Sequence, residues 1–321
     1  MIKVSSLEFN YRQSVKNAIN GIDFNINNGE IFGFLGPSGA GKTTTQRIIV
    51  GLLRNYRGSV EVMGLERRKW GRDFFEKIGV VFDFPNLYEK LTAYENLDLF
   101  GSYYRNNMAN KEELLDSVGL LPDRDKRVEN YSKGMKMRLN FIRSITHDPN
   151  LLFFDEPTSG LDPVNAKIIR NMILALKKAG KTIFLTTHNM TEADYLCDRV
   201  AFIIEGKVPV IDSPSELKLK HGSKTVEVVY YPGNAAGTDS NNIGTGKAID
   251  HVTSISKETG TVSNNTEPKS KNCLTVQFPL NGIGSNKQFL EILSRYKIRT
   301  MHTQEATLED IFIKLTGREL Q

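Results

Sequence analysis

Short runs of hydrophobic residues, each followed by a polar or glycine-rich stretch, recur along residues 30–220. Runs of this kind are typical of strands buried on both faces of a parallel sheet. Several of the stretches between them carry hydrophobic residues at the spacing of an amphipathic helix. We therefore predict an α/β core wound on a mostly parallel sheet. The expected buried strands are Glu30–Leu35, Lys77–Phe82, Leu151–Phe154, Thr182–Thr187 and Val200–Ile204.

The first 30 residues follow a different pattern, in which hydrophobic and polar residues alternate in places. Ile2, Val4, Leu7 and Phe9 form one such series, and a second runs from Ile19 to Ile26. This alternation predicts antiparallel strands with a turn at residues 27–29. A further strand is expected between two glycines at residues 58–64. Together these segments predict an antiparallel β subdomain beside the core.

Residues 84–148 are predicted to form a helical subdomain. Thr92 and Glu95 have the spacing of a capping box, in which each residue satisfies a backbone N–H of the other. Asn110 and Ser132 precede two further amphipathic segments and are suitable N-caps. Outside this subdomain, helices are expected at Thr44–Leu53 and Ile168–Lys178.

The character of the chain changes after Lys220, where a polar segment rich in Gly, Ser, Thr and Asn interrupts the pattern at residues 232–270. We predict a larger domain at residues 1–221 and a smaller α+β domain at residues 222–321. The expected elements of the second domain are strands at Thr225–Tyr231, Ile249–Ile255, Leu274–Phe278 and Ile298–Met301, and helices at Lys287–Arg295 and Leu308–Leu315.

Composition excludes several classes of protein. The 321 residues are 39% hydrophobic and 25% charged, which is typical of a folded globular protein. The net charge of +5 is not concentrated in a basic block, so no nucleic-acid partner is expected. Cys197 and Cys273 lack metal-ligand spacing, which predicts a protein without disulfide or zinc. No signal-peptide core and no apolar run of the ~20 residues that span a bilayer occur, so a membrane role would require another chain.

A glycine-rich stretch directly follows the first buried strand. It reads Gly36-Pro37-Ser38-Gly39-Ala40-Gly41-Lys42-Thr43, which fits the phosphate-loop pattern of a glycine, four free positions and Gly-Lys-Thr. Glycines allow successive backbone N–H groups to line a nest around a polyphosphate. Lys42 would place its charge on the β- and γ-phosphates, and the Thr43 hydroxyl would ligate Mg²⁺. Thr44 follows in a helix whose positive end faces the same anion.

Two further candidate groups end buried strands. Asp155 and Glu156 follow Leu151–Phe154, and open α/β sheets bind ligands at the carboxyl ends of their strands. We expect Asp155 to hold Mg²⁺ and Glu156 to polarise a water for attack on the γ-phosphate. His188 follows Thr182–Thr187 and is a candidate to contact the γ-phosphate or orient that water. An isolated Asp-Glu pair is often only a solvated loop, but the phosphate loop upstream favours the catalytic interpretation.

These motifs share the chain, in a fixed order, with Tyr131-Ser132-Lys133-Gly134-Met135 and Ser159-Gly160-Leu161-Asp162. Together they resemble the nucleotide-binding cassette of ABC transporters, and the resemblance covers residues 1–220. It implies a phosphate-loop NTPase core with an antiparallel β subdomain and a helical signature subdomain. It also implies ATP and Mg²⁺ as cofactors and ATP hydrolysis as the activity.

The resemblance further implies a head-to-tail dimer with a second copy of the chain. Each ATP would lie between the loop of one copy and Ser132, Lys133 and Gly134 of the other. Asp162 would communicate across the interface, and Tyr11 would stack on the adenine base.

The chain departs from the family pattern at two positions. The signature usually reads Leu-Ser-Gly-Gly-Gln, and here Lys133 replaces its first glycine while Ser132 and Gly134 remain. Asp83 stands where most members carry a glutamine. A carboxylate could bind Mg²⁺ more tightly but lacks the N–H donors of an amide, so Asp83 is a candidate metal ligand whose role at the glutamine position is open.

Three segments resemble the ATPase subunits of bacterial multidrug-type exporters, namely the variant signature, Asp83–Tyr88 and the tail Ala306–Gly317. In such exporters a separate multi-span permease forms the channel, and Phe84–Tyr104 would meet it. The expected location is cytoplasmic, peripheral on the inner face of the cell membrane. Two alternatives remain open here: a soluble ABC-type ATPase acting on nucleic acid or the ribosome, and a regulatory nucleotide switch with little turnover, which Asp83 keeps open.

Overall fold

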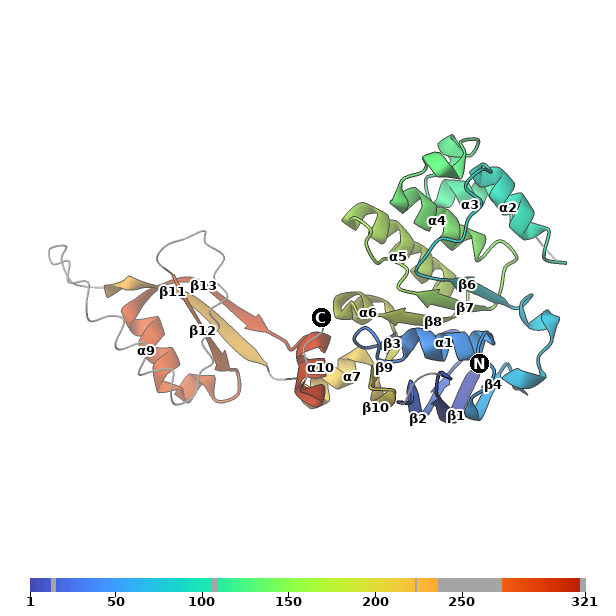
Figure 1. Cartoon of the computed structure of the whole chain (residues 1–321). Helices are drawn as coiled ribbons and strands as arrows, with labels where there is room; N and C mark the ends of the chain where they lie inside the picture. The colour runs from blue at the N-terminus through green and yellow to red at the C-terminus, as the bar shows by residue number, and fades with distance from the viewer. Residues whose placement is uncertain (13–15, 106–108, 223, 236–272, 318–321) are drawn as a thin grey trace. The chain divides into compact units, whose positions relative to one another are not determined.

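The computed structural model describes residues 1–12, 16–105, 109–222, 224–235 and 273–317 (Figure 1). The chain divides into two compact units. The first is Met1–Glu216 together with Phe312–Gln321, and the second is Leu217–Ile311. The sequence analysis predicted the boundary slightly later, between residues 221 and 222. It did not predict that the end of the chain, from Phe312, belongs to the first unit. The strand predicted near Ile249–Ile255 lies outside the described residues.

A six-stranded sheet forms the centre of the first unit, with the order β10-β9-β3-β8-β7-β6. Its strands are β3 (Ile31–Leu35), β6 (Ile78–Val81), β7 (Leu151–Asp155), β8 (Thr182–Thr187), β9 (Arg199–Ile204) and β10 (Lys207–Asp212). All neighbours pair in parallel except β10, which runs antiparallel to β9. Every residue of β3, β7 and β8 is buried, as the hydrophobic runs predicted. Strand β10 was not predicted, because its residues are only half-buried and polar residues interrupt the apolar ones.

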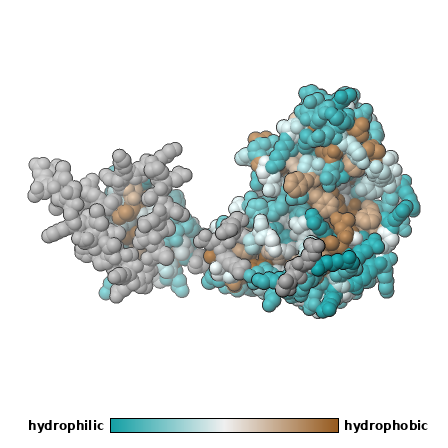
Figure 2. Space-filling view, in the orientation of Figure 1, coloured by the Kyte–Doolittle hydropathy of each residue, from teal (hydrophilic) through white to brown (hydrophobic). Residues whose placement is uncertain are grey.

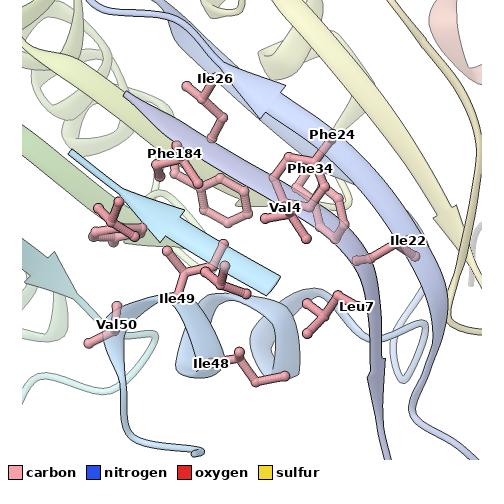
Figure 3. Close-up of a cluster of buried hydrophobic side chains, with 14 of the residues drawn as sticks. Val4, Leu7, Ile22, Phe24, Ile26, Phe34, Ile48, Ile49, Val50 and Phe184 are labelled. Atoms are coloured by element: carbon pink, nitrogen blue, oxygen red, sulfur yellow. The ribbon is translucent and has the colours of Figure 1, made fainter. Parts of the chain in front are cut away.

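A second, antiparallel sheet has the order β2-β1-β4-β5. It consists of β1 (Ile2–Phe9), β2 (Ile19–Ile26), β4 (Arg57–Val62) and the short β5 (Leu65–Glu66). Side chains of β1 and β2 meet those of β3, β8 and helix α1 in one hydrophobic cluster (Figure 3). Within it the ring of Phe24 stacks on Phe32 with the centroids 5.6 Å apart. This cluster fixes α1 and the loop before it against both sheets.

The helices of the first unit are α1 (Lys42–Val50), α2 (Ala93–Gly101), α3 (Lys111–Ser117), α4 (Lys133–Arg143), α5 (Pro163–Lys178) and α6 (Met190–Leu196), and α7 (Pro214–His221) crosses into the second unit. Short 3₁₀ helices lie at Arg67–Lys69, Arg72–Phe74, Leu121–Asp123 and Val128–Asn130. The three predicted N-caps are confirmed. Thr92 forms both bonds of a capping box with Glu95, and the side chains of Asn110 and Ser132 accept from the backbones of Glu112 and Met135. The short helices α6 and α7 were not predicted.

The second unit is a three-stranded antiparallel sheet with the order β12-β11-β13. Its elements are β11 (Thr225–Ala235), β12 (Leu274–Pro279), a 3₁₀ turn at Ile283–Ser285, α9 (Lys287–Arg295) and β13 (Tyr296–Gln304). Helix α9 packs Phe289 and Ile292 onto a cluster that includes Val228 and Phe278 of the sheet. Helix α10 (Leu308–Thr316) follows, and from Phe312 onward the chain belongs to the first unit. Within that unit the Phe312 ring packs edge-on against Phe202 of β9, with the ring centroids 5.3 Å apart.

Candidate functional site

The sheet topology brings three predicted motifs to one edge. Strands β3, β8 and β7 are parallel neighbours, with Leu35 beside Thr187 and Thr186 beside Asp155. The segments that leave their carboxyl ends therefore emerge side by side. They are the loop from Gly36 to Gly41, the Asp155-Glu156 pair, and the turn at His188.

The loop after β3 has a backbone shape that depends on glycine. Gly39 and Gly41 have positive φ angles of 77° and 115°, and Gly41 is the N-cap of α1. A Cβ at Gly36 would overlap the Ile203 carbonyl, so only glycine lets the loop lie this close to β9. The Nζ atom of Lys42 donates to the carbonyls of Gly36 at 2.6 Å and Pro37 at 3.1 Å. The lysine thus holds the loop around its own buried ammonium group.

Asp155 is nearly fully buried at the end of β7 and accepts two hydroxyl hydrogen bonds. Thr43 Oγ1 donates to Asp155 Oδ2 at 3.0 Å, and the Thr186 hydroxyl donates to Oδ1. Burial raises the pKa of Asp155, and the nearby charges of Asp83 and Glu156 act in the same direction. The site therefore carries a carboxylate that is costly to keep ionised without a cation.

Glu156 links the three segments. Its Oε1 lies 2.9 Å from His188 Nδ1 and 3.8 Å from Lys42 Nζ, and Thr187 Oγ1 donates to its Oε2 at 3.3 Å. An ionised carboxylate only accepts, so Nδ1 carries the proton of this contact. Glu156 also has a positive φ of 48°, a strained conformation for this residue type. Burial lowers the pKa of Lys42, and the charges of Glu156 and Asp155 oppose that shift.

Tyr11, the residue expected to stack on adenine, lies beside the first turn of α1. Its hydroxyl is 3.1 Å from Thr44 Oγ1, and its ring packs edge-on against Phe9 with the centroids 4.9 Å apart. The side chain remains 41% exposed. An aromatic surface is therefore available next to the start of α1.

The signature residues form a separate group at the N-termini of α4 and α5. Ser132 is exposed and caps α4, and Asp162 caps α5 by accepting from the backbone of Val164 and Asn165. A Cβ at Gly160 would overlap the Lys133 ammonium group, so that group rests against Gly160 of the same chain. Within one copy, the structure shows no contact between this group and the described loop residues.

The donors around Thr43 fit a magnesium ion, because an alcohol and a carboxylate are the hard oxygen ligands that it prefers. Asp83 is exposed, follows β6, and acts on Asp155 through its charge. Among the residues that the structure describes, no three His, Cys, Asp or Glu side chains gather closely enough to hold a metal. A magnesium ion here would thus need the Thr43 hydroxyl and oxygens of a bound ligand as well as Asp155.

Sequence reasoning missed residues that support this edge. Thr186 and Thr187 contact Asp155 and Glu156, and their position at the end of a buried strand was an available signal. Glu192 of α6 gave no such signal. It is 2% exposed, its Oε2 accepts from Thr158 Oγ1 at 2.5 Å, and its Oε1 has no hydrogen-bond partner among the described residues. Burial raises the pKa of Glu192.

Comparison with known proteins identifies the family of the chain. The ABC transporter family model matches residues 19–159, and a model described as the fluoroquinolone efflux ABC transporter C-terminal domain matches residues 270–305. A fluoroquinolones export ATP-binding protein of Mycobacterium tuberculosis is 43% identical over 320 residues, covering 100% of this chain and 94% of that protein. A linearmycin resistance ATP-binding protein of Bacillus subtilis is 31% identical over 315 residues, covering 95% and 96%.

Solved structures show the same fold. An ATP-binding cassette described as a dimer in a post-hydrolysis state with ADP and Pi superposes with a TM-score of 0.60 at 27% identity, covering 66% of this chain and 98% of that one. No helix in the described part of the chain is both long and apolar enough to cross a membrane. The predicted cassette fold and ATPase activity are confirmed, and the transporter interpretation is favoured over its alternatives. The chain belongs to the ABC transporter family, as one of its ATP-binding, ATP-hydrolysing subunits.

Proposed function

We propose that this subunit powers export through a separate membrane permease, and that its nucleotide site works as half of a composite site in a dimer. The observation that carries the proposal is the convergence of Lys42, Asp155 and Glu156 at one sheet edge. One contact, at 3.8 Å, joins the loop lysine to Glu156, and another, at 3.0 Å, joins Thr43 to Asp155. Such a cluster is suited to binding a polyphosphate and activating a water beside it.

Each residue has a distinct role in this proposal. Lys42 neutralises the phosphates, and in doing so exchanges its two loop carbonyl partners for a stronger charged acceptor. Glu156 accepts the proton of the attacking water. His188 holds the Glu156 carboxylate through Nδ1, and Thr187 holds its second oxygen, so the base has a fixed orientation. Tyr11 offers its exposed ring to the adenine.

The residues present also fit a magnesium ion. When bound, Mg²⁺ would neutralise negative charge on the phosphate oxygens. Thr43 and Asp155 would hold it, with Asp83 as a further acidic group nearby. This role explains why a buried carboxylate is kept at Asp155, where burial alone disfavours its ionised form.

The signature residues complete the site only if a second copy supplies them. In one copy Ser132 caps α4, and the Lys133 ammonium group lies against Gly160. Ser132 and the positive end of α4 are exposed and suited to an anion. The dimeric cassette among the solved relatives supports this arrangement.

Export is supported by the full-length relatives, which are named for export of fluoroquinolones and Nod factor and for linearmycin resistance. Two of these names give export and the three differ in compound, so the proposal stops at export. Three aromatic side chains are exposed on the segment that follows Asp83. They are Phe84, Tyr88 and Tyr103. Exposed aromatics are enriched at protein interfaces, which supports this segment as the permease-facing surface.

Purification of the full chain from its host's membranes in mild detergent tests the proposal. We expect a multi-span membrane protein to co-purify, and we expect the ATPase rate of the complex to exceed that of the isolated chain. Lys42→Ala is the matched control, because it should retain the partner and lose the ATPase activity. Failure of the active wild-type chain to bring down any multi-span partner would overturn the export proposal.

A further inference from the structure

Gln46 is a polar residue in the interior of the first unit, on helix α1. Hydrophilic residues cover much of the face of this unit in Figure 2, where a polar side chain can bond to water. Gln46 is instead 0% exposed, and both its Oε1 and its Nε2 are buried without a hydrogen-bond partner among the described residues. An amide removed from water without partners is destabilising. Burial alone therefore disfavours this residue type at this position.

Asn96 shows how a structural amide is buried in this protein. It is also 0% exposed, but its Oδ1 accepts from the Tyr88 backbone at 2.9 Å. Its Nδ2 donates to the carbonyls of Tyr88 at 3.0 Å and Thr92 at 2.8 Å. Thr45, next to Gln46 on α1, is likewise buried and donates to a backbone carbonyl at 2.9 Å. These two polar side chains have partners within the chain, and Gln46 has none among the described residues.

The position of Gln46 on α1 places it beside the residues of the nucleotide site. It follows Lys42 by four residues and Thr43 by three, and residues so spaced are neighbours on one face of a helix. Helical side chains point back toward the N-terminus, so the Gln46 amide extends toward the turn that begins at Lys42. On that turn Thr43 donates to Asp155 at 3.0 Å. Gln46 is therefore one turn behind the residues that we propose for the phosphates and the metal.

Two carboxylates near this turn differ in their hydrogen-bond donors. Asp155 accepts from the hydroxyls of Thr43 and Thr186. Asp83 is exposed and makes no hydrogen bond or ion pair with another described residue, and its charge acts on Asp155. An ionised carboxylate only accepts, whereas an amide both donates and accepts. The amide of Gln46 and the carboxylate of Asp83 are therefore chemically complementary, and both belong to the surroundings of the contact between Thr43 and Asp155.

We propose that Gln46 is a positioning residue of the nucleotide site, which holds the Asp83 carboxylate toward the magnesium-binding residues. The inference rests on the magnesium site proposed above. In the complex with Mg²⁺ and nucleotide, Nε2 of Gln46 donates to Asp83, and Oε1 accepts from a water molecule at the ion. Both polar atoms of the buried amide then have partners. This role explains why an amide is kept on a buried helix face that provides none.

The dependence of nucleotide binding on magnesium tests this role without turnover. A fluorescent, non-hydrolysable ATP analogue is titrated into the full chain with Mg²⁺ and with EDTA. For Gln46→Met, which keeps the length of the side chain and removes the amide, we expect an affinity about 10-fold lower with Mg²⁺ and unchanged in EDTA. Gln46→Leu is a second apolar replacement with the same expected result. Full magnesium-dependent affinity of these variants overturns the inference and leaves the magnesium site in place.

Thermal unfolding without nucleotide separates this role from a structural one. The midpoint of Gln46→Met should match or exceed that of the wild type, because the variant buries no unpartnered amide. Asn96→Leu is the control, which should lower the midpoint and leave the response of nucleotide binding to Mg²⁺ unchanged. A midpoint of Gln46→Met as low as that of Asn96→Leu would assign Gln46 a structural role and overturn the inference.

A second substitution tests the pairing with Asp83. Gln46→Met combined with Asp83→Gln returns an amide to the site at the other position, so it should regain most of the magnesium-dependent affinity. Gln46→Met combined with Asp83→Leu should not regain it. Equal affinity of these two double variants overturns the inference. A wild-type chain that binds the analogue equally with Mg²⁺ and with EDTA overturns the magnesium site, and the role of Gln46 with it.

Discussion

Two buried lysines, one at each edge of the parallel sheet, have different hydrogen-bond and ion-pair partners. Lys42 at the carboxyl edge and Lys181 at the amino edge are 7% and 8% exposed. Lys181 pairs with the Asp148 carboxylate at 2.6 Å and also donates to that residue's carbonyl at 3.2 Å. Among the described residues, Lys42 has only loop carbonyls within hydrogen-bond distance, and its nearest carboxylate, Glu156, is 3.8 Å away.

This difference separates a structural charge from a functional one. At the amino edge the buried Glu30 is likewise paired, with Arg199 at 3.2 Å. At the carboxyl edge, burial lowers the pKa of Lys42 and raises those of Asp155 and Glu192. Displaced pKa values beside the phosphate loop, where the nearest described carboxylate is 3.8 Å from Lys42, support a site that a ligand completes.

The largest expected effect tests the two lysines directly. Lys42→Ala should lower ATP turnover about 100-fold or more, because the phosphates lose their buried cation. Lys181→Ala should keep near-normal turnover and lower the thermal unfolding midpoint, since it breaks only a structural pair. Steady-state phosphate release and thermal unfolding of both variants make the comparison. Equal losses of turnover would show that the two edges do not differ in the way described.

A smaller effect is expected at Tyr11, which borders the carboxyl edge. Tyr11→Ala should weaken ATP binding about 10-fold, because base–aromatic stacking contributes about 1–3 kcal/mol. Tyr11→Phe keeps the ring and loses only the hydroxyl contact with Thr44, so it should bind almost as the wild type does. Titration with a fluorescent ATP analogue measures both, and Tyr195→Ala, which removes an exposed ring on α6, is the control. Weaker binding by Tyr11→Phe than by Tyr11→Ala would exclude stacking.

The smallest effect concerns the stability of the carboxyl edge. Glu192→Gln should stabilise the protein by about 1 kcal/mol at neutral pH, because the amide still accepts from Thr158 and the buried charge is gone. Folded Glu192 retains its proton above the ordinary pKa of 4.5, so wild-type stability falls as pH rises from 4.5 through the raised folded value. The advantage of the variant should therefore grow over that window.

Urea unfolding at several pH values measures this advantage. Glu61→Gln, an exposed substitution in β4, should show no such trend. An advantage of Glu192→Gln that shrinks with rising pH would contradict the assigned cause.

Most of the sheet could be predicted from the sequence because its strands are buried on both faces. Leu151–Asp155 and Thr182–Thr187 have every residue buried, so their hydrophobic runs are continuous. The phosphate loop was predictable because glycines at fixed spacing are required by its backbone, as the positive φ of Gly39 and Gly41 shows. Features that depend on burial of a whole strand or on local backbone conformation can therefore be recognised from the sequence alone.

The remaining features depend on contacts between distant segments. Glu192 acquires its character from burial against Thr158, and Gln46 from full burial without a hydrogen-bond partner among the described residues. Neither environment is visible in the residues next to them. The contact of Lys133 with Gly160 also joins segments that are distant in the sequence. The predicted contact of Lys133 with phosphate would form only with the ATP of a second copy.

The central claim is that the carboxyl edge hydrolyses ATP with Glu156 as the base, and Glu156→Gln tests it most directly. The substitution keeps the size of the side chain and removes its capacity to take a proton. We expect ATP turnover about 100-fold or more below the wild type, with ATP binding retained and an ATP-dependent dimer detected by size-exclusion chromatography. Turnover within about twofold of the wild type would contradict the assignment of Glu156 as the base.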